Sequence, residues 1–345
     1  MPFCAARCDY CAFATWTDRH HLQESYLDAC LTDVERSVAA GLPAATSIFV
    51  GGGTPSLVAP ERLMEVLAAV PRAPDCEVTV ECNPDTVTPA LASAYAAGGV
   101  NRISLGVQSM VDHVLVALGR THDPANVRRA VEWVREAGIP TLNLDLIYGV
   151  AGESLDDWRR TLDEALALDP PHVSAYALTV EAGTPLADDP ARHPDDDDQA
   201  EKYLAASTAL EEAGLAWYEI SNWARPGHEC RHNQLYWTMG EYQAFGCAGH
   251  SHRAGRRFWN VRTPERYIAA VTGGESPEAA GERLDPDERR LEALQLAVRT
   301  RGGVPAATLP VEDLADLVSV DTAGGQAVLT VRGRLLANEV ALRLR

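Results

Sequence analysis

Residues 1–11 read Met-Pro-Phe-Cys-Ala-Ala-Arg-Cys-Asp-Tyr-Cys, with thiols at Cys4, Cys8 and Cys11. Three thiols so close together, in a stretch without a regular hydrophobic period, can converge on one metal centre. A closed structural zinc site needs four ligands, and a fully ligated four-iron cluster needs four thiolates. Three thiols on a four-iron cluster leave one iron open to a chelating small molecule. The spacing therefore favours a [4Fe-4S] cluster over two alternatives, a zinc site completed by His20 or His21 and three unconnected thiols.

The composition limits what kind of protein this is. The chain has 345 residues, enough for one large domain and a smaller one, and 46% of them are hydrophobic. Its formal net charge of −19, from 49 acidic and 30 basic residues, argues against non-specific binding to nucleic acid. No run approaches the roughly twenty apolar residues of a membrane span. The eight cysteines are not spaced like a secreted disulfide framework, so we expect a reducing, cytoplasmic location.

Strands alternate with helices after the cysteine stretch. Short apolar strands, each ending in a polar or glycine-rich tip, are predicted at 47–50, 77–80, 102–107, 141–147 and 172–180. Helices are predicted at 17–40 and near 60–70, 88–97, 124–137 and 154–168. This order implies a parallel sheet with right-handed crossovers. We expect an α/β fold, a partial (β/α)6 barrel that lacks its first strand, with an open doubly wound sheet as the alternative; residues 217–220 read as one more strand.

The strand tips carry the candidate site residues, because chemistry in such folds gathers at the C-terminal ends of the strands. Three consecutive glycines after the first strand allow backbone N–H groups to approach a ligand closely. Carboxylates and amides at later tips can bind hydroxyl or ammonium groups, although each also reads as a capped turn or an internal salt bridge. An arginine beyond the third strand could hold a carboxylate or only oppose a helix dipole. In chain order these residues are Gly51, Gly52, Gly53, Glu81, Gln108, Arg120 and Asp145.

The sequence changes character after residue 222, where loops are expected. His232 lies there beside Asn233, with Tyr236 and Trp237 close behind. Neutral imidazole binds iron well, and aromatic walls suit a flat macrocycle, so His232 is either a haem ligand or a satisfied structural histidine. We predict three parts: a partial barrel at 1–222, a linker and haem-binding segment at 223–283, and a small module at 284–345.

The C-terminal module is predicted to be α+β and to resemble a winged helix. It opens with a helix from Asp285-Pro286 to about 298, continues with a short helix at 311–317 and a strand at 328–331, and closes with a final helix. Winged helices often bind DNA, but this module lies in an acidic chain and has no densely basic helix. A packing or partner-docking role is the expectation.

Seven motifs together carry a family resemblance: Cys4-Ala-Ala-Arg-Cys8-Asp-Tyr-Cys11, Gly51-Gly-Gly-Thr-Pro-Ser, Glu81-Cys-Asn-Pro, Asn101-Arg-Ile-Ser-Leu-Gly-Val-Gln108, Asp145-Leu-Ile-Tyr-Gly149, Tyr176-Ala-Leu-Thr and His232-Asn-Gln-Leu-Tyr-Trp237. They span nearly the whole chain. The chain resembles the radical SAM (S-adenosylmethionine) family, and within it the group that contains oxygen-independent coproporphyrinogen III dehydrogenase (HemN) and the haem chaperone HemW.

Two features bring the chain closer to HemW than to HemN. HemN-type dehydrogenases carry a fourth cysteine two residues after the triad, where this chain has Phe13, and a long N-terminal arm, where this chain has three residues before Cys4. The His-Asn-x-x-Tyr-Trp segment is typical of HemW-like proteins.

The resemblance implies a haem chaperone that binds haem and transfers it to acceptor proteins, membrane-associated respiratory proteins among them. It implies a [4Fe-4S] cluster with bound SAM and no coproporphyrinogen dehydrogenase activity. The alternatives are that dehydrogenase itself, which acts in porphyrin biosynthesis, and a radical SAM enzyme with another substrate. The implied cluster ligands are Cys4, Cys8 and Cys11, the implied haem ligand is His232, and the implied SAM-site residues are Tyr10, Gly52, Gly53, Thr54, Glu81, Gln108, Arg120 and Asp145.

The start of the chain raises one further expectation. A parallel barrel places a strand directly before such a cysteine loop, but only Met1-Pro2-Phe3 precede it here, and Pro2 cannot donate a ladder hydrogen bond. Without that strand, residues 47–50 would keep an unpaired edge. We expect the natural protein to begin upstream of Met1.

Overall fold

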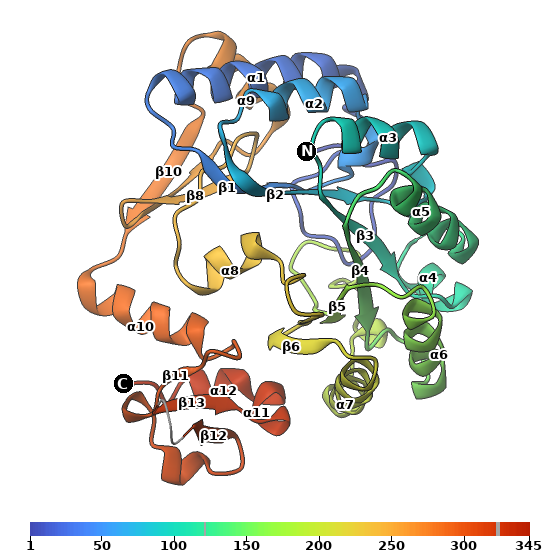
Figure 1. Cartoon of the computed structure of the whole chain (residues 1–345), viewed down its shortest axis with the longest axis vertical. Coiled ribbons are helices and arrows are strands. Elements are labelled where there is room, and N and C mark those ends of the chain that lie inside the picture. Colours follow the sequence, from blue (N-terminus) through green and yellow to red (C-terminus); the bar gives the residue numbers. More distant parts are fainter. Residues whose placement is uncertain (121, 322–324) are drawn as a thin grey trace.

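The computed structural model of the chain describes residues 1–120, 122–321 and 325–345. Its largest element is a seven-stranded sheet in the order β1-β2-β3-β4-β5-β7-β6, curled into a half-barrel (Figure 1). Strands β1 to β5 are parallel neighbours, which confirms the predicted partial barrel. The strands are β1 (Ala45–Val50), β2 (Arg72–Cys82), β3 (Arg102–Gln108), β4 (Thr141–Tyr148), β5 (His172–Ala177), β6 (Ala216–Glu219) and β7 (Asn222–Ala224).

The sheet ends in a hairpin. The strand expected at 217–220 is β6, but it pairs antiparallel with β7, and β7 pairs antiparallel with β5. Only Ile220 and Ser221 separate β6 from β7, too few for the crossover that a parallel pair requires. The sequence did not reveal β7 because three residues are too short to show a period.

Helices cover the outer side of the sheet (Figure 1). They lie within a few residues of the predicted stretches, and several have a proline in the first turn or a capping side chain; Ser154 and Asp157, for example, form a capping box. These helices are α1 (Gln23–Ala39), α2 (Pro60–Ala68), α3 (Pro89–Ala97), α5 (Pro124–Glu136), α6 (Leu155–Leu166) and α7 (Asp196–Glu212), with a further short helix α4 (Asp112–Ala117).

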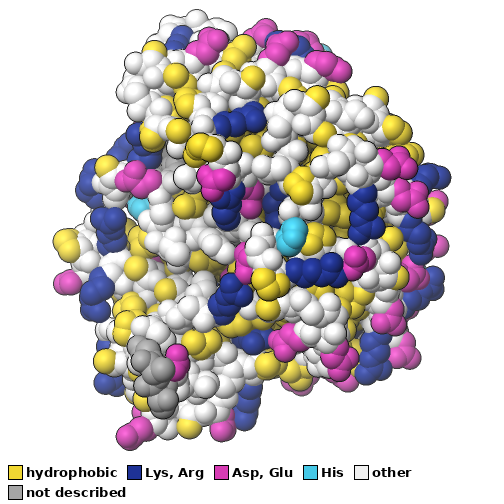
Figure 2. Space-filling view, viewed as in Figure 1, with side chains coloured by type: hydrophobic (Ala, Val, Ile, Leu, Met, Phe, Trp, Pro, Cys, Tyr) yellow, Lys and Arg dark blue, Asp and Glu magenta, His cyan; other side chains and the backbone are white. Residues whose placement is uncertain are grey.

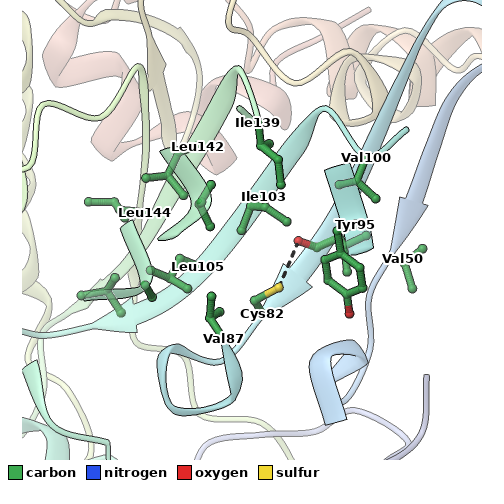
Figure 3. Packing of buried hydrophobic residues seen from close by; sticks show 14 of the residues in the cluster. Val50, Cys82, Val87, Tyr95, Val100, Ile103, Leu105, Ile139, Leu142 and Leu144 are labelled. Carbon is green, nitrogen blue, oxygen red and sulfur yellow. Dashed lines mark hydrogen bonds between the residues drawn. The ribbon is translucent and has the colours of Figure 1, made fainter. Parts of the chain in front are cut away.

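The outer face of the sheet forms the main core. Val80, Ile103 and Leu142 stand in register on adjacent strands and are almost fully buried. Figure 3 shows Ile103 and Leu105 of β3 beside Tyr95 of α3, with Val50, Cys82, Val87, Val100, Ile139, Leu142 and Leu144 around them. Because helices exclude water from this face, burial of apolar area stabilises the whole half-barrel.

The inner face of the sheet is polar. One residue from each of four strands stands in register on it: Glu81, Ser104, Asn143 and His172. The amide of Asn143 donates from Nδ2 to Ser104 Oγ (2.7 Å) and accepts at Oδ1 from His172 Nδ1 (2.6 Å). Ser104, Asn143 and His172 are buried, so these bonds replace the water that the side chains lose.

The rest of the chain adds two small sheets. The first, in the order β10-β9-β8, contains β8 (His250–Arg253), β9 (Arg256–Asn260) and β10 (Glu278–Arg283), and α9 (Pro264–Thr272) joins it to α1. The second, in the order β11-β13-β12, contains β11 (Val304–Pro305), β12 (Val318–Asp321) and β13 (Gln326–Leu329). With α10 (Pro286–Ala297) and α12 (Ala337–Ala341), this second sheet forms a separate hydrophobic cluster, whereas Val331 and Leu335 of α11 (Val331–Leu335) pack against the main core.

The C-terminal helices differ in detail from the prediction. Asp285 caps α10 in a capping box, as expected, but the helix expected at 311–317 is a single 3-10 turn, Val311–Leu314. The expected final helix is two short helices, because the chain changes direction at Leu336 between α11 and α12.

The surface carries charges of both signs. On the face in Figure 2, basic and acidic side chains are interspersed among apolar ones. In the part of the chain that the structure describes, no helix is both long enough and apolar enough to cross a membrane.

One buried ion cluster fixes the loop between β4 and α6. The side chains of Lys202 and Glu153 are fully buried, and Lys202 Nζ lies 3.2 Å from Glu153 Oε2 and 2.7 Å from Asp198 Oδ2. Glu153 Oε2 also accepts from the backbone N–H groups of Gly149 (2.8 Å) and Val150 (3.3 Å). The lysine therefore compensates a carboxylate that organises the tip of β4.

We predict that Lys202→Met destabilises the protein by about 3–5 kcal/mol, because the substitution leaves the Glu153 carboxylate buried without its cation. The measurement is urea unfolding. The matched control is Arg160→Met, which breaks an i,i+4 ion pair with Glu164 at an exposed position and should change stability by about 0.5 kcal/mol or less. Equal losses in the two variants would contradict the prediction.

Candidate functional site

The three cysteines of the opening motif lie on an irregular segment before α1, and all three are partly exposed. This segment is tied to the barrel through Asp9. Its N–H donates to Leu118 O (3.3 Å), and its Oδ2 accepts from Arg192 (2.8 Å). A Cβ on Gly119 would lie only 2.8 Å from Asp9 Oδ1, so the segment packs too closely for a larger residue there. The thiols are thus presented from a fixed loop.

The glycine-rich tip of β1 lies directly against the cysteine segment. Gly53 N–H donates to Met1 O (2.6 Å) and Thr54 N–H to Phe3 O (2.8 Å). A Cβ on Gly53 would lie 2.6 Å from Phe3 O and 3.0 Å from Cys4 Sγ, so glycine is the residue that permits this approach. The Thr54 hydroxyl donates to Cys4 Sγ at 3.7 Å. The glycine tip of β1 therefore contacts the first cysteine of the motif.

Two carboxylates lie near this tip, Glu81 on β2 and Asp145 on β4, with β3 between the two strands. Glu81 accepts from Gly52 N–H (3.2 Å), and Asp145 accepts from the Ser104 hydroxyl (2.7 Å). Burial, and then repulsion by Asp145, raises the pKa of Glu81 to about 7. Burial also raises the pKa of Asp145, while its hydrogen bonds from Ser104 and Asn143 oppose the rise. Neither acid forms an ion pair with another of the described residues, so the two desolvated carboxylates are suited to an ammonium or hydroxyl ligand.

Gln108 and Arg120 meet on the other side of the site. A Cβ on Gly106 would lie 3.1 Å from Gln108 Nε2 and 3.4 Å from Arg120 Nη2, so this glycine makes room for both side chains. Arg120 donates to Gly106 O (2.7 Å) and reaches Cys8 Sγ at 3.6 Å. Its buried Nε has no hydrogen-bond partner among the described residues. Tyr10 lies close by: burial raises the pKa of its hydroxyl, and the charge of Arg120 opposes that rise.

The donor set fits a thiolate-bound cluster with an open iron. Burial raises the pKa of the Cys4 and Cys11 thiols, so a metal must displace their protons on binding. Within residues 1–120, 122–321 and 325–345, no three His, Cys, Asp or Glu side chains are arranged to hold one metal ion. A four-iron cluster does not require such convergence, because each thiolate binds a different iron. Polar groups are also available for a ligand beside such a cluster. They are the N–H groups of the glycine tip, the carboxylates of Glu81 and Asp145, and the unpartnered Nε of Arg120.

The segment after residue 229, expected as a loop, is partly helical. Residues Arg231–Trp237 form α8 on the inner face of the sheet, between β1 and α10 (Figure 1). The carboxylate of Glu77 on β2 accepts from the N–H groups of Arg231 and His232, both at 3.1 Å. Tyr218 accepts from Cys230 N–H at 3.3 Å. The sequence could not reveal this helix because its N-terminal hydrogen bonds are supplied by residues distant in the chain.

His232 is held on three sides. Its Nδ1 lies 3.0 Å from Ser47 Oγ and its Nε2 lies 2.9 Å from the Tyr236 hydroxyl. Its ring stacks on Phe49 with the ring centroids 5.2 Å apart. Burial lowers the pKa of His232 to about 4, so the imidazole is neutral at physiological pH, as metal ligation requires. Tyr236 is 42% exposed, so the Nε2 side of the ring is the side nearer solvent.

Phe49 connects the His232 position with the glycine tip. A Cβ on Gly51 would lie 2.8 Å from the Phe49 ring and 2.8 Å from Glu81 Oε2. The same aromatic ring therefore contacts His232 on one side and borders the carboxylate site on the other. The two groups of residues that the sequence singled out separately are neighbours in the structure.

Sequence reasoning missed several residues that shape these sites. Ser104 and Gly106 lie inside a motif that was recognised, and their alternation with buried apolar residues on β3 is the signal that could have identified them. The others act through contacts between distant segments and leave no local pattern. They are Asp9, Ser47, Phe49, Glu77, Gly119 and Arg192.

Comparison with known proteins identifies the fold. A family model for the radical SAM superfamily matches residues 1–165. The solved structure of coproporphyrinogen III oxidase (HemN) from Escherichia coli, a radical SAM enzyme, superposes with a TM-score of 0.84 over 99% of this chain and 88% of that one. The two sequences are only 20% identical, so this likeness shows the fold alone.

The sequence relatives are more informative. The heme chaperone HemW of Mycobacterium tuberculosis is 41% identical over 363 residues, which cover 100% of this chain and 93% of that protein. The heme chaperone HemW of Bacillus subtilis is 31% identical over 99% of this chain and 96% of its own length. The mitochondrial radical S-adenosyl methionine domain-containing protein 1 of Bos taurus is 34% identical over 89% of this chain and 69% of its own length. The chain therefore belongs to the HemW family within the radical SAM superfamily.

Proposed function

We propose that the protein is a haem chaperone that binds haem at His232, delivers it to acceptor proteins and carries a [4Fe-4S] cluster with SAM. The observation that carries the proposal is a neutral imidazole, fixed on α8 with its Nε2 toward the solvent side, in a chain 41% identical to a heme chaperone over its full length. In this proposal residues 1–222 hold the cluster and SAM, residues 223–283 bind haem, and residues 284–345 are a packing or docking module. The location is the cytoplasm, and the acceptors include membrane-associated respiratory proteins.

The cluster end of the proposal rests on the cysteine segment and the strand tips. Cys4, Cys8 and Cys11 would supply the thiolates, and the remaining iron would be open to the amino and carboxylate groups of SAM. Tyr10 would lie beside the cluster. Gly52, Gly53 and Thr54 would border the amino-acid end of SAM, where a side chain at either glycine would collide with Met1 O, Phe3 O or Cys4 Sγ. Glu81 and Asp145 offer carboxylates for ammonium and hydroxyl groups, and Gln108 and Arg120 offer N–H donors.

The haem end rests on the surroundings of His232. Both partners are hydroxyls, so either tautomer satisfies both contacts; in the tautomer suited to iron, Nδ1–H donates to Ser47 Oγ and Nε2 accepts from the Tyr236 hydroxyl. Nε2 is then the atom available to iron once Tyr236 turns away. When bound, haem supplies an iron with an axial position that neutral imidazole fills well. The Ser47 contact would hold the orientation of the ring when Nε2 binds iron.

We predict that serine at Cys4, Cys8 or Cys11 abolishes the cluster, because a hydroxyl is a poor ligand for the iron of such a cluster. Anaerobic reconstitution of the wild-type chain should give about four iron and four sulfide per chain, and each variant should lose its brown absorption. Cys30→Ser is the matched control: Cys30 is buried in α1, outside the cysteine segment, and its removal should leave the iron content unchanged. If Cys30→Ser and Cys8→Ser lose equal amounts of iron, the three-thiolate proposal is wrong.

We predict that Glu81→Gln stabilises the SAM-free protein increasingly as the pH rises from 5 to 8. The folded-state pKa of Glu81, about 7, lies above its ordinary value of 4.5. Its contribution to stability is therefore fully present below pH 4.5 and is lost as the pH rises through 7. Glutamine cannot ionise, so the variant escapes that loss.

The measurement is the free energy of unfolding of both proteins at each pH. Glu278→Gln serves as the control, because Arg256 lowers the pKa of Glu278 and its contribution is lost only in acid. Parallel pH profiles for wild type and Glu81→Gln would show that Glu81 is not a desolvated acid.

We predict that His232→Ala lowers haem affinity at least tenfold and alters the Soret band, because the axial nitrogen is lost. His113→Ala, at an exposed position on α4, should change neither. The wild-type protein, reconstituted anaerobically with SAM and a reductant, should not convert coproporphyrinogen III, since Phe13 stands where the dehydrogenases have a fourth cysteine. Unchanged haem binding in His232→Ala, or conversion of coproporphyrinogen at a useful rate, would overturn the proposal.

A further inference from the structure

A second histidine in this protein is better prepared than His232 to bind iron without rearrangement of its own bonds. His252 lies on β8 and is only 5% exposed. Its backbone exchanges two 2.9 Å hydrogen bonds with Tyr242, which fixes the position of the residue. Its Nδ1 lies 3.0 Å from the carbonyl oxygen of Gly240. A carbonyl can only accept, so Nδ1 carries the proton and Nε2 carries the lone pair.

His252 lines a cavity, and Nε2 is its free ring nitrogen. Among the described residues Nε2 has no hydrogen-bond partner, and His252 lines a cavity of about 170 Å³ that is open to solvent on one side. An imidazole whose Nδ1–H is held by a backbone carbonyl keeps Nε2 free, which is the arrangement that metal-ligating histidines commonly show. The other walls come from α8, the segment between α8 and β8, β9, the end of β10 and α10, and they include aromatic and aliphatic side chains: Tyr236, Met239, Tyr242, Leu284 and Leu296.

Two arginines line the cavity, and one of them has no ion-pair partner among the described residues. Arg257 lines it, but this guanidinium is already paired with Glu282 at 2.9 Å and with Glu292. Arg289, on α10, also lines it, and within the described ranges its guanidinium makes no hydrogen bond or ion pair. A cavity with aromatic and aliphatic walls, two acids already paired with Arg257, one free guanidinium and one free imidazole nitrogen suits a flat, iron-bearing ligand that carries carboxylates.

The cavity is connected to the His232 position by aromatic rings. The Tyr236 ring contacts His232 edge-on with a centroid separation of 5.2 Å, and it contacts Tyr242 at 4.8 Å. The Tyr242 ring lies 6.0 Å from the His252 ring. Tyr236 is thus shared, since it is the hydrogen-bond partner of His232 and part of the cavity wall. The same rotation that frees His232 Nε2 would enlarge the cavity.

We propose that His252 is a second haem-iron ligand, in a site between α8, β8–β9 and α10, with Arg289 facing a haem propionate. The inference rests on the proposed haem-chaperone function and adds a second position for the same ligand. A volume of about 170 Å³ is below the roughly 300–1,000 Å³ of most small-molecule sites. Helix α10, which lines one side of the cavity, must therefore move to admit the whole macrocycle. None of the α10 residues is fully buried, and Leu294 and Ala297 pack against the C-terminal hydrophobic cluster as partly buried residues.

The test is a titration of the full-length chain with ferric haem, followed by the Soret band. His232→Ala should keep a weaker haem-binding component with a shifted band. His232→Ala/His252→Gln should bind at least tenfold more weakly than His232→Ala, because glutamine can still donate to Gly240 O but cannot supply the ligand nitrogen. The matched control is His232→Ala/His250→Ala: His250 is two residues away on β8, stacked on Trp259, and its removal should leave the component unchanged.

Each outcome is decisive. If His232→Ala binds no haem, or if adding His252→Gln changes nothing, His252 is not a haem ligand, while the proposed function stands. If the wild-type chain itself binds no haem, the proposed function fails. Unchanged iron content of the cluster and unchanged thermal unfolding exclude loss of fold in the double variant. In the His232→Ala background, Arg289→Gln should weaken haem but not haem dimethyl ester; an equal effect on both would remove the propionate from the proposal.

Discussion

The polar inner face of the half-barrel depends on the side chain of Asn143. Its amide donates to Ser104 Oγ and to Asp145 Oδ1 and accepts from His172 and Ser174. Every one of these groups is buried or nearly so, and an unpaired polar group there would destabilise the fold by about 1–3 kcal/mol. The Ser104–Asp145 hydrogen bond fixes the Asp145 carboxylate of the candidate SAM site. His172 extends the network, because its Nε2 lies 2.8 Å from the Tyr218 hydroxyl. The network therefore extends from a strand tip to the residue that holds the start of α8.

The buried strands and the helices that cover them could be predicted from the sequence, because each is marked by a pattern of neighbouring residues. Val78, Val80, Ile103 and Leu142 are apolar residues bounded by glycine-rich or polar tips, and proline or a capping residue marks the start of most helices. The C-terminal ends of parallel strands must meet at one edge, so Gly53, Glu81, Gln108 and Asp145 were expected to be neighbours. Gly53 contacts the cysteine segment, Glu81 accepts from the Gly52 N–H, and the charge of Asp145 raises the pKa of Glu81; the metal and cofactor roles of these residues remain proposals.

The parts that the sequence did not reveal are the ones that depend on distant contacts. Helix α8 was expected as a loop because its caps are Glu77 and Tyr218, which come from β2 and β6. Strand β7 has three residues and exists because β5 and β6 supply its partners. The pairing of His232 with Ser47 and Phe49, and of Arg120 with Gly106, has no periodic signature. Such contacts become visible only when the sheet brings together segments that lie far apart in the chain.

Strand β1 contacts both the cysteine segment and His232, so a change in one contact affects the other. Its tip forms the glycine turn that contacts the cysteine segment, and two residues on its inner face, Ser47 and Phe49, hold the His232 ring. A shift of this strand by a few tenths of an ångström would move the turn and the imidazole together. A mechanical link of this kind needs no signalling residue between the two ends, because one rigid strand is part of both. Binding of a ligand at the turn and release of a ligand from α8 would then both depend on the position of β1. A shift of β1 caused by binding at the turn would also move the His232 ring.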